Sequence, residues 1–164
     1  MDRGYIYLNK KSYLHNIEVL KNLSKKELCL VVKANAYGHG LEWAVKNAKE
    51  SGVKWFAVAS VDEGIEVKKV YGDSRVLLLA EPSITQLDNV KENNIDLTVY
   101  NESFIDTLIE TGDEFSVHLK IDTGMHRLGC PPEKFYNLHK KIADSNLNLV
   151  GICTVSYTHL RAHE

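Results

Sequence analysis

Short apolar runs, many of them β-branched, alternate along the chain with longer stretches in which apolar residues recur at helical spacing. The apolar runs predict six strands, over residues 28–32, 54–59, 75–79, 96–100, 116–121 and 148–154. The stretches between them predict helices over residues 41–50, 62–70, 83–92, 102–110 and 132–144. We expect Asp62, Ser83 and Asn101 to cap three of these helices at their N-termini.

Each of the six strands is nearly continuously apolar, which is typical of strands covered on both faces. Repeated strand–helix units predict a parallel sheet. Successive strands begin about 20 to 30 residues apart, which suits either a βα barrel or a doubly wound sheet. A further strand over residues 5–9 and a helix over residues 12–23 precede this series.

The turn after the first of the six strands distinguishes the two architectures. A doubly wound dinucleotide-binding sheet would carry G-x-G-x-x-G there. This chain has K-A-N-A-Y-G-H-G over residues 33–40, which lacks the third glycine and places its lysine before the glycines. We therefore predict an α/β fold of the (β/α)8 TIM type that is incomplete, because about six of the eight strands are present.

Composition and charge limit the classes of partner that this chain could bind. The 164 residues are 44% hydrophobic and 26% charged, with a formal net charge of −2, as in an ordinary soluble domain. Near-neutral charge argues against a nucleic-acid or membrane-surface partner, and no apolar run is long enough to span a membrane. The N-terminus lacks the apolar stretch of a signal peptide, so we expect a cytoplasmic protein. Three widely spaced cysteines suit reduced thiols and indicate no metal site.

Lys33 is the first candidate for chemistry, because it follows an apolar run at the end of a strand where a barrel active site would lie. Burial disfavours the ammonium form, and a neutral amine can attack an aldehyde to form a Schiff base. The alternative is a strand-end lysine that simply reaches solvent. The phenol of Tyr37, together with Gly38 and Gly40, which allow a ligand to approach the backbone, favours a functional site.

The segment from Val31 to Gly40 closely resembles the pyridoxal-phosphate attachment motif of the alanine racemase family. The resemblance implies that Lys33 holds pyridoxal 5'-phosphate as a Schiff base. It further implies that Lys33 is one of two acid/base groups at the α-carbon of the substrate, and that Tyr37 contacts the cofactor phosphate.

A second cluster, Lys120 to Gly129, follows the fifth of the six strands and reads K-I-D-T-G-M-H-R-L-G. Taken alone, it could be an ion pair between Lys120 and Asp122 beside a solvated Arg127. On the barrel interpretation it lies at the same end as Lys33. It also resembles the family, which implies that Arg127 lies near the phenolic oxygen of the cofactor and the substrate carboxylate. By the same resemblance Met125 lines the substrate site, and Lys120 is a lysine that is carbamylated in some members.

The resemblance ends near residue 154. We expect residues 1–154 to be a partial N-terminal barrel domain, amounting to less than half of a family member. The family continues G-I-x-T-H after the corresponding strand, whereas Val155 stands at the histidine position here. His159 lies out of register and is not assigned that role. We predict that residues 155–164 are a foreign or shifted tail.

The resemblance implies a racemase that interconverts L- and D-alanine and so supplies D-alanine for cell-wall peptidoglycan. In the family the second acid/base group is a tyrosine from the C-terminal β domain of the other subunit of a homodimer. We therefore expect the 164 residues alone to be inactive. Two alternatives stay open: a racemase for serine or another small amino acid, and a non-catalytic protein that binds pyridoxal phosphate on the same barrel.

Overall fold

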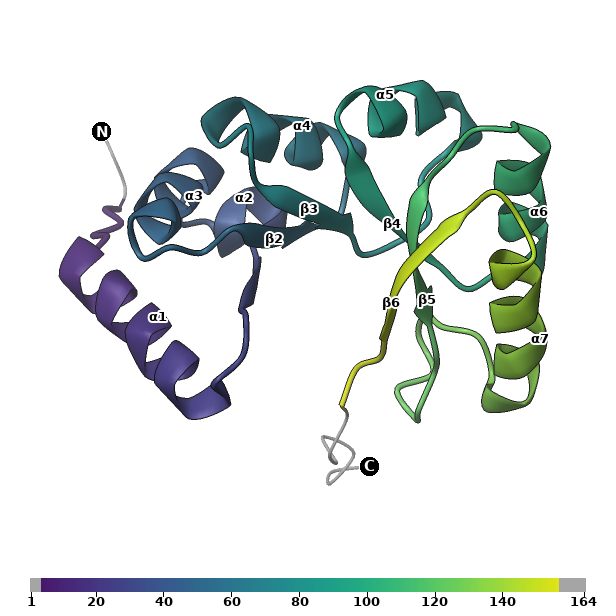
Figure 1. Cartoon of the computed structure of the whole chain (residues 1–164). Coiled ribbons are helices and arrows are strands. Elements are labelled where there is room, and N and C mark those ends of the chain that lie inside the picture. The colour runs from purple at the N-terminus through teal and green to yellow at the C-terminus, as the bar shows by residue number, and fades with distance from the viewer. Residues whose placement is uncertain (1–3, 157–164) are drawn as a thin grey trace. The chain divides into compact units, whose positions relative to one another are not determined.

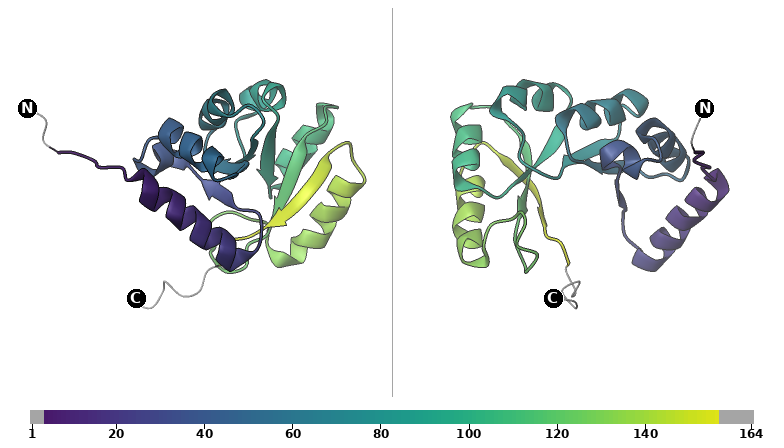
Figure 2. Two further views of the ribbon diagram at one scale, coloured as in Figure 1. Left: turned by 60° about the vertical axis from the view of Figure 1, so that its left-hand side comes forward. Right: turned by 180° about the vertical axis from the view of Figure 1, so that it is seen from behind.

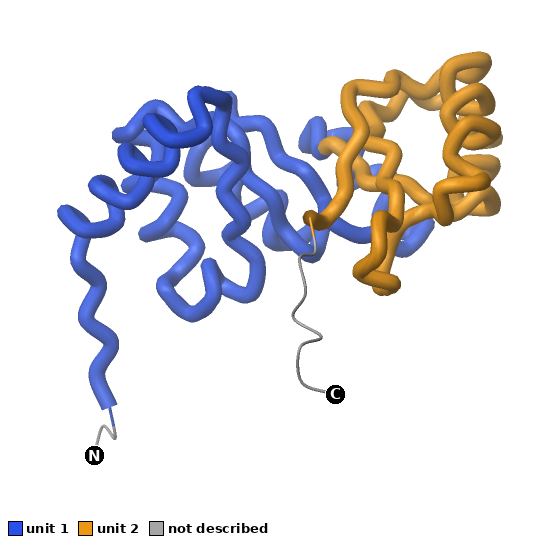
Figure 3. The backbone as a smooth tube through the Cα atoms, turned by 90° about the horizontal axis from the view of Figure 1, so that it is seen from below, with its two compact units in different colours: residues 1–95 blue, residues 96–164 orange. Residues whose placement is uncertain are grey.

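The computed structural model describes residues 4–156 of the chain. It divides into two compact units, residues 1–95 and residues 96–164 (Figure 3). Each unit is built from parallel strands joined by helices, and the two are described in turn.

The first unit contains three parallel strands, in the spatial order β1-β2-β3. Their residues pair in step, with Cys29 opposite Trp55 and Trp55 opposite Arg75. Figure 1 shows the elements, which in chain order are α1 (Lys10–Ser24), β1 (Cys29–Val31), α2 (Lys33–Tyr37), α3 (Leu41–Glu50), β2 (Trp55–Val58), α4 (Val61–Val70), β3 (Arg75–Leu78), the 3-10 turn η1 (Ile84–Gln86) and α5 (Leu87–Glu92).

The second unit contains β4 (Ile95–Val99, beginning at the last residue of the first unit), α6 (Glu102–Glu110), β5 (Ser116–Lys120), α7 (Pro132–Ala143) and β6 (Asn148–Cys153). The strands are parallel in the order β4-β5-β6, and the register of β5 against β6 shifts between Val117 and His118. Helices α6 and α7 lie along one side of these strands (Figure 2). Ile105, Leu108 and Ile142 on the helices are fully buried.

Strands β4 and β5 also carry buried polar side chains: Thr98, His118 and Lys120. Thr98 is the register partner of His118, and His118 is the register partner of Gly151. His118 is only 4% exposed, and its Nε2 lies 3.5 Å from Oδ2 of Asp96. A Cβ on Gly151 would lie 2.5 Å from His118 Nδ1. The imidazole therefore needs a glycine on the neighbouring strand. Lys120, 6% exposed, lies two residues further along β5.

The predicted order of the six strands is confirmed, and all six form within one residue of the predicted bounds. The helices over residues 41–50 and 102–110 form as predicted, whereas the helix predicted over 83–92 is divided into η1 and α5 because Gln86 (φ −103°, ψ 0°) leaves helical geometry. The N-terminal cap of α4 is Ser60 and not Asp62: the Ser60 side chain accepts a hydrogen bond from the backbone of Glu63.

The strand predicted over residues 5–9 is wrong. No strand forms there, and Asn9 instead caps α1 by accepting a hydrogen bond from the N–H of Ser12 at 3.0 Å. A strand requires a neighbour to pair with its backbone, and none of the described residues pairs with this segment. Tyr5, Ile6 and Tyr7 are consequently 93%, 77% and 87% exposed. No helix in the described range is long and apolar enough to cross a membrane.

Candidate active site

Lys33 lies one residue beyond the end of β1, after Val32, and is the first residue of α2, which is a left-handed turn. Ala34, Asn35, Ala36 and Tyr37 all have φ between 50° and 54°, so the chain makes a left-handed helical turn. The left-handed conformation costs a residue with a Cβ about 1–2 kcal/mol. Four such residues in succession persist only where the surroundings hold them. The lysine side chain itself is half-buried.

Hydrogen bonds within the motif hold this turn. The backbone N–H of Ala36 donates to the carbonyl oxygen of Val32 at 2.8 Å. The side-chain oxygen of Asn35 accepts from the N–H of Leu41 at 2.7 Å, and its backbone oxygen accepts from the N–H of Gly40 at 2.9 Å. Asn35 therefore joins the turn to the first residue of α3. The N-A-Y-G-H-G string is thus explained largely by backbone geometry.

A carboxylate from outside the motif also contacts the turn. Glu63, in the first turn of α4, accepts a hydrogen bond from the backbone N–H of Ala34 through Oε1 at 2.6 Å. Its other oxygen, Oε2, accepts from the N–H of Ala59 at 2.9 Å. Glu63 thereby joins the residue after Lys33 to the chain that leaves β2. No sequence motif for a site includes Glu63, although the S-x-x-E string of residues 60–63 is a known helix-start pattern.

Tyr37 ends the left-handed turn and is 61% exposed. It lies at an apolar pocket of about 270 Å³, formed by α1, β1 and the turn, whose lining includes Ile17, Leu20 and Val31. Lys33 does not line this pocket. Gly38, the next residue, has φ of 85°, and apart from its two chain neighbours no described residue has an atom within 4 Å of the position that a Cβ would occupy. The backbone beside Tyr37 is therefore open to a ligand.

In the second unit, the segment from Ile121 to Cys130 closes on itself as a loop. Cys130 donates to the carbonyl oxygen of Lys120 at 2.8 Å and accepts from the N–H of Asp122 at 2.9 Å. Gly129 (φ 138°) makes this closure, since a Cβ there would lie 2.7 Å from the backbone nitrogen of Asp122. The loop therefore returns to the end of β5, where it began.

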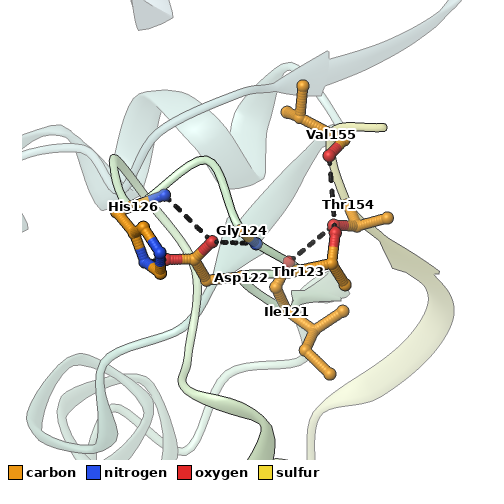
Figure 4. Close-up of polar contacts among 7 residues, drawn as sticks. All are labelled: Ile121, Asp122, Thr123, Gly124, His126, Thr154 and Val155. Atoms are coloured by element: carbon orange, nitrogen blue, oxygen red, sulfur yellow. Dashed lines mark hydrogen bonds and ion pairs between the residues drawn. The ribbon is translucent and has the colours of Figure 1, made fainter. Parts of the chain in front are cut away.

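Asp122 organises the interior of the loop (Figure 4). Its Oδ1 accepts hydrogen bonds from the N–H groups of Gly124 at 2.9 Å and His126 at 3.0 Å, and its Oδ2 lies 3.2 Å from Nδ1 of His126. These two N–H groups hold the pKa of the Asp122 carboxyl below its ordinary value. The carboxylate thus orients the loop that carries Met125, which is half-buried, and Arg127, which is exposed.

The end of β6 is tied to the start of the same loop. Thr154 Oγ1 donates to the carbonyl oxygen of Ile121 at 2.8 Å and lies 2.8 Å from Thr123 Oγ1. The carbonyl oxygen of Val155 accepts from Thr123 Oγ1 at 3.4 Å (Figure 4). The position at which the family pattern has a histidine therefore lies against this loop and carries a valine side chain. His159 falls outside the described residues.

Lys120 and Cys153 are register partners at the ends of β5 and β6. Burial raises the pKa of the Cys153 thiol, and the positive charge of Lys120 partly opposes this shift. Cys29, Cys130 and Cys153, all within the described residues, form no disulfide. Among residues 4–156, no group of three His, Cys, Asp or Glu side chains could hold a metal ion.

The structure groups the selected residues by unit. Lys33 and Tyr37 belong to one left-handed turn in the first unit. Lys120, Met125 and Arg127 belong to β5 and its closed loop in the second unit. That the two groups serve one ligand stays a prediction.

Parallel strands joined by helices and a lysine near the carboxyl end of a strand are typical of a class of α/β proteins that place their chemistry at strand ends. Within this class, the sequence profile described as "Alanine racemase, N-terminal domain" matches residues 8–160. The chain therefore belongs to the alanine racemase family, in the part that forms its N-terminal domain.

Individual relatives agree. An alanine racemase of Treponema denticola is 36% identical over 159 residues, which cover 93% of this chain and 41% of the relative. An amino-acid racemase of Enterococcus faecalis is 34% identical over 163 residues, 98% of this chain and 22% of the relative. The crystal structure of alanine racemase from E. faecalis matches with a TM-score of 0.85 at 26% identity, over 92% of this chain and 43% of that chain.

This likeness confirms the predicted α/β barrel-type fold. The chain spans about two-fifths of the length of the T. denticola relative and of the solved structure.

The two loop glycines predict different costs of substitution. Gly124→Ala and Gly129→Ala both place a Cβ on a backbone with positive φ, but only at residue 129 does the new atom meet backbone atoms. We expect Gly129→Ala to lower the free energy of unfolding by about 1–3 kcal/mol more than Gly124→Ala. Denaturant unfolding of both variants measures the difference. Equal losses would show that the closure of the loop at Gly129 does not matter for stability.

Acid is expected to loosen the Asp122 loop. The pKa of this carboxyl is lower in the folded loop than in the unfolded chain. Its stabilisation is therefore complete above the ordinary Asp pKa of about 3.9 and is lost as the pH falls through the lowered value. NMR titration of the Gly124 and His126 amide signals should show a midpoint below that of an exposed carboxyl. Asp122→Asn should abolish this transition, and an ordinary midpoint would contradict the proposed hydrogen bonds.

Proposed function

We propose that the whole protein is a pyridoxal-phosphate-dependent amino-acid racemase that interconverts L- and D-alanine. The observation that carries the proposal is the strained left-handed turn that fixes Lys33 at the end of β1. Backbone strain that the surroundings must hold is concentrated at functional sites. Membership of the alanine racemase family and the names of the relatives support the same activity.

The side chains present fit this cofactor chemically. Lys33 offers a half-buried primary amine, the group that condenses with an aldehyde. The exposed phenol of Tyr37 can donate a hydrogen bond to a phosphate oxygen, and the open backbone at Gly38 leaves room for the phosphate group. Arg127 is exposed and permanently charged, with donors that match a carboxylate or a phenolate oxygen.

Each residue then has a stated task. When bound, pyridoxal phosphate supplies a conjugated ring that takes up the negative charge left when the α-carbon loses its proton. Lys33 removes or returns that proton on one face of the substrate. Tyr37 binds the phosphate. Arg127 binds the substrate carboxylate, while Met125 lines the substrate site through its backbone and Lys120 supports Arg127.

Inversion of the α-carbon needs a second acid/base group on the opposite face. We propose that the whole protein is a homodimer and that the partner subunit supplies a tyrosine for this task. We further propose a cytoplasmic enzyme without nucleic-acid or membrane partners, whose D-alanine enters cell-wall peptidoglycan. The second candidate, a racemase of another small amino acid such as serine, is favoured by one finding: the E. faecalis relative bears the broader name amino-acid racemase.

The role of Lys33 predicts a site-specific adduct. Incubation of the chain with pyridoxal phosphate followed by borohydride should fix the cofactor on Lys33, as peptide mass spectrometry would show. Lys33→Ala should abolish the adduct, whereas Lys54→Ala, which removes an exposed lysine before β2, should leave it unchanged. Labelling spread over many lysines without preference for Lys33 would overturn the proposed function.

Substrate choice predicts a difference in turnover. The product of the complete reading frame, incubated with L-alanine or L-serine, should racemise alanine faster. Circular dichroism of the amino acid follows the reaction. Lys33→Ala should lower kcat/KM by at least about 100-fold, the lower end of what a general acid/base contributes. Faster racemisation of serine would favour the second candidate, and binding of cofactor without racemisation of any amino acid would indicate a non-catalytic protein.

A further inference from the structure

Glu63 lies where two neighbouring strands end. The last backbone hydrogen bond between the two segments runs from the N–H of Val32, the residue after β1, to the carbonyl oxygen of Ala57 in β2 at 2.9 Å. Beyond it, the first segment enters the left-handed turn and the second enters α4. The N–H groups of Ala34 and Ala59 both donate to the Glu63 carboxylate, one to each oxygen. The carboxylate thus links the two segments of the chain beyond the point where their backbones pair directly.

This arrangement differs from an ordinary helix cap. In a capping box the glutamate three residues after the cap reaches back to the backbone N–H of the cap residue. Here Ser60 caps α4 by accepting from the N–H of Glu63 at 3.2 Å. The Glu63 carboxylate instead contacts the residue before the cap, Ala59, and Ala34, which is 29 residues away in sequence. The hydrogen bond between Ser60 and the N–H of Glu63 caps the helix, whereas the Glu63 carboxylate binds the turn that begins at Lys33.

Glu63 contacts the left-handed turn at its first residue. Ala34 is the first of the four left-handed residues, with φ of 50° and ψ of 52°. Its N–H belongs to the peptide group that joins it to Lys33, so the hydrogen bond to Glu63 fixes the plane of that peptide. Hydrogen bonds to an ionised acceptor are stronger than those between neutral groups. The direction in which Lys33 leaves the backbone therefore depends on Glu63.

We infer that Glu63 is the positioning residue of Lys33: its carboxylate holds the peptide after Lys33 and the end of β2, and so sets the position of the lysine amine. The consequence for cofactor binding rests on the proposed function. Glu63→Gln is the sharpest variant, because the amide keeps one acceptor oxygen and turns an NH₂ donor toward one of the two N–H groups. Its size and its place on the helix are retained.

Two matched controls separate positioning from helix stability. Glu66→Gln makes the same chemical change one turn later on α4, at an exposed side chain. Ser60→Ala removes the helix cap and leaves the carboxylate in place. If Glu63 acted only through the stability of α4, Ser60→Ala would reproduce the effects of Glu63→Gln.

The first readout needs no cofactor. Amide hydrogen exchange, followed by NMR, should be accelerated by about tenfold or more at Ala34 and Ala59 in Glu63→Gln, consistent with loss of a charge-assisted hydrogen bond. The N–H of Ala36, which donates to the carbonyl oxygen of Val32, should exchange as slowly in Glu63→Gln as in the unaltered chain. Glu66→Gln should leave all three amides unchanged. Unaltered exchange at Ala34 in Glu63→Gln would overturn the inference.

The second readout is the affinity of Lys33 for pyridoxal phosphate, measured from the visible absorbance of the Schiff base and mapped after borohydride reduction. We expect Glu63→Gln to weaken it by about tenfold and Ser60→Ala to leave it unchanged. Equal weakening in both variants would show that Glu63 acts only by stabilising α4, and would overturn the inference. If the unaltered chain forms no adduct at Lys33, the proposed function fails, and the exchange at Ala34 still decides the role of Glu63. Should Glu63→Gln fail to fold, Glu63→Asp, which is too short to reach both N–H groups, is compared with Ser60→Ala in both measurements.

Discussion

Backbone conformation immediately after β1 is the constraint on which the candidate active site depends. Residues 34–37 hold left-handed angles although each carries a Cβ, at a cost of about 1–2 kcal/mol per residue. Hydrogen bonds between the turn and three neighbouring parts of the chain offset this cost. Val32 supplies a carbonyl, Asn35 joins the turn to α3, and Glu63 joins it to α4. Lys33 is thus held on a rigid backbone.

The same principle recurs in the second unit. Asp122 gathers the N–H groups of Gly124 and His126 just after β5, as Glu63 gathers those of Ala34 and Ala59 after β1 and β2. In both places the strands have stopped pairing and their backbone donors need acceptors. One carboxylate with two oxygens satisfies two donors and fixes the loop between them. Loops that carry exposed side chains such as Arg127 become ordered without a large apolar core of their own.

Local signals explain which predictions succeeded. The apolar runs of the six strands and the helical spacing of residues 41–50 and 102–110 are properties of short segments, and they form as expected. The strand over residues 5–9 failed because apolar alternation does not create a pairing partner. The turn α2 was missed because alanine and tyrosine carry no preference for left-handed angles. Glu63 was missed because its partner Ala34 is 29 residues away.

The amino-acid sequence by itself determined the order of the six strands and the parallel α/β class. It also placed Lys33 and Arg127 in the segments that follow two of the strands, since all of this follows from periodicity and from motifs of about ten residues. Only the tertiary structure decided how those groups are held. The left-handed turn, the bridging carboxylate of Glu63 and the fit of the His118 ring against Gly151 each join residues from different elements. Such contacts form only when distant segments pack together, so no local pattern specifies them.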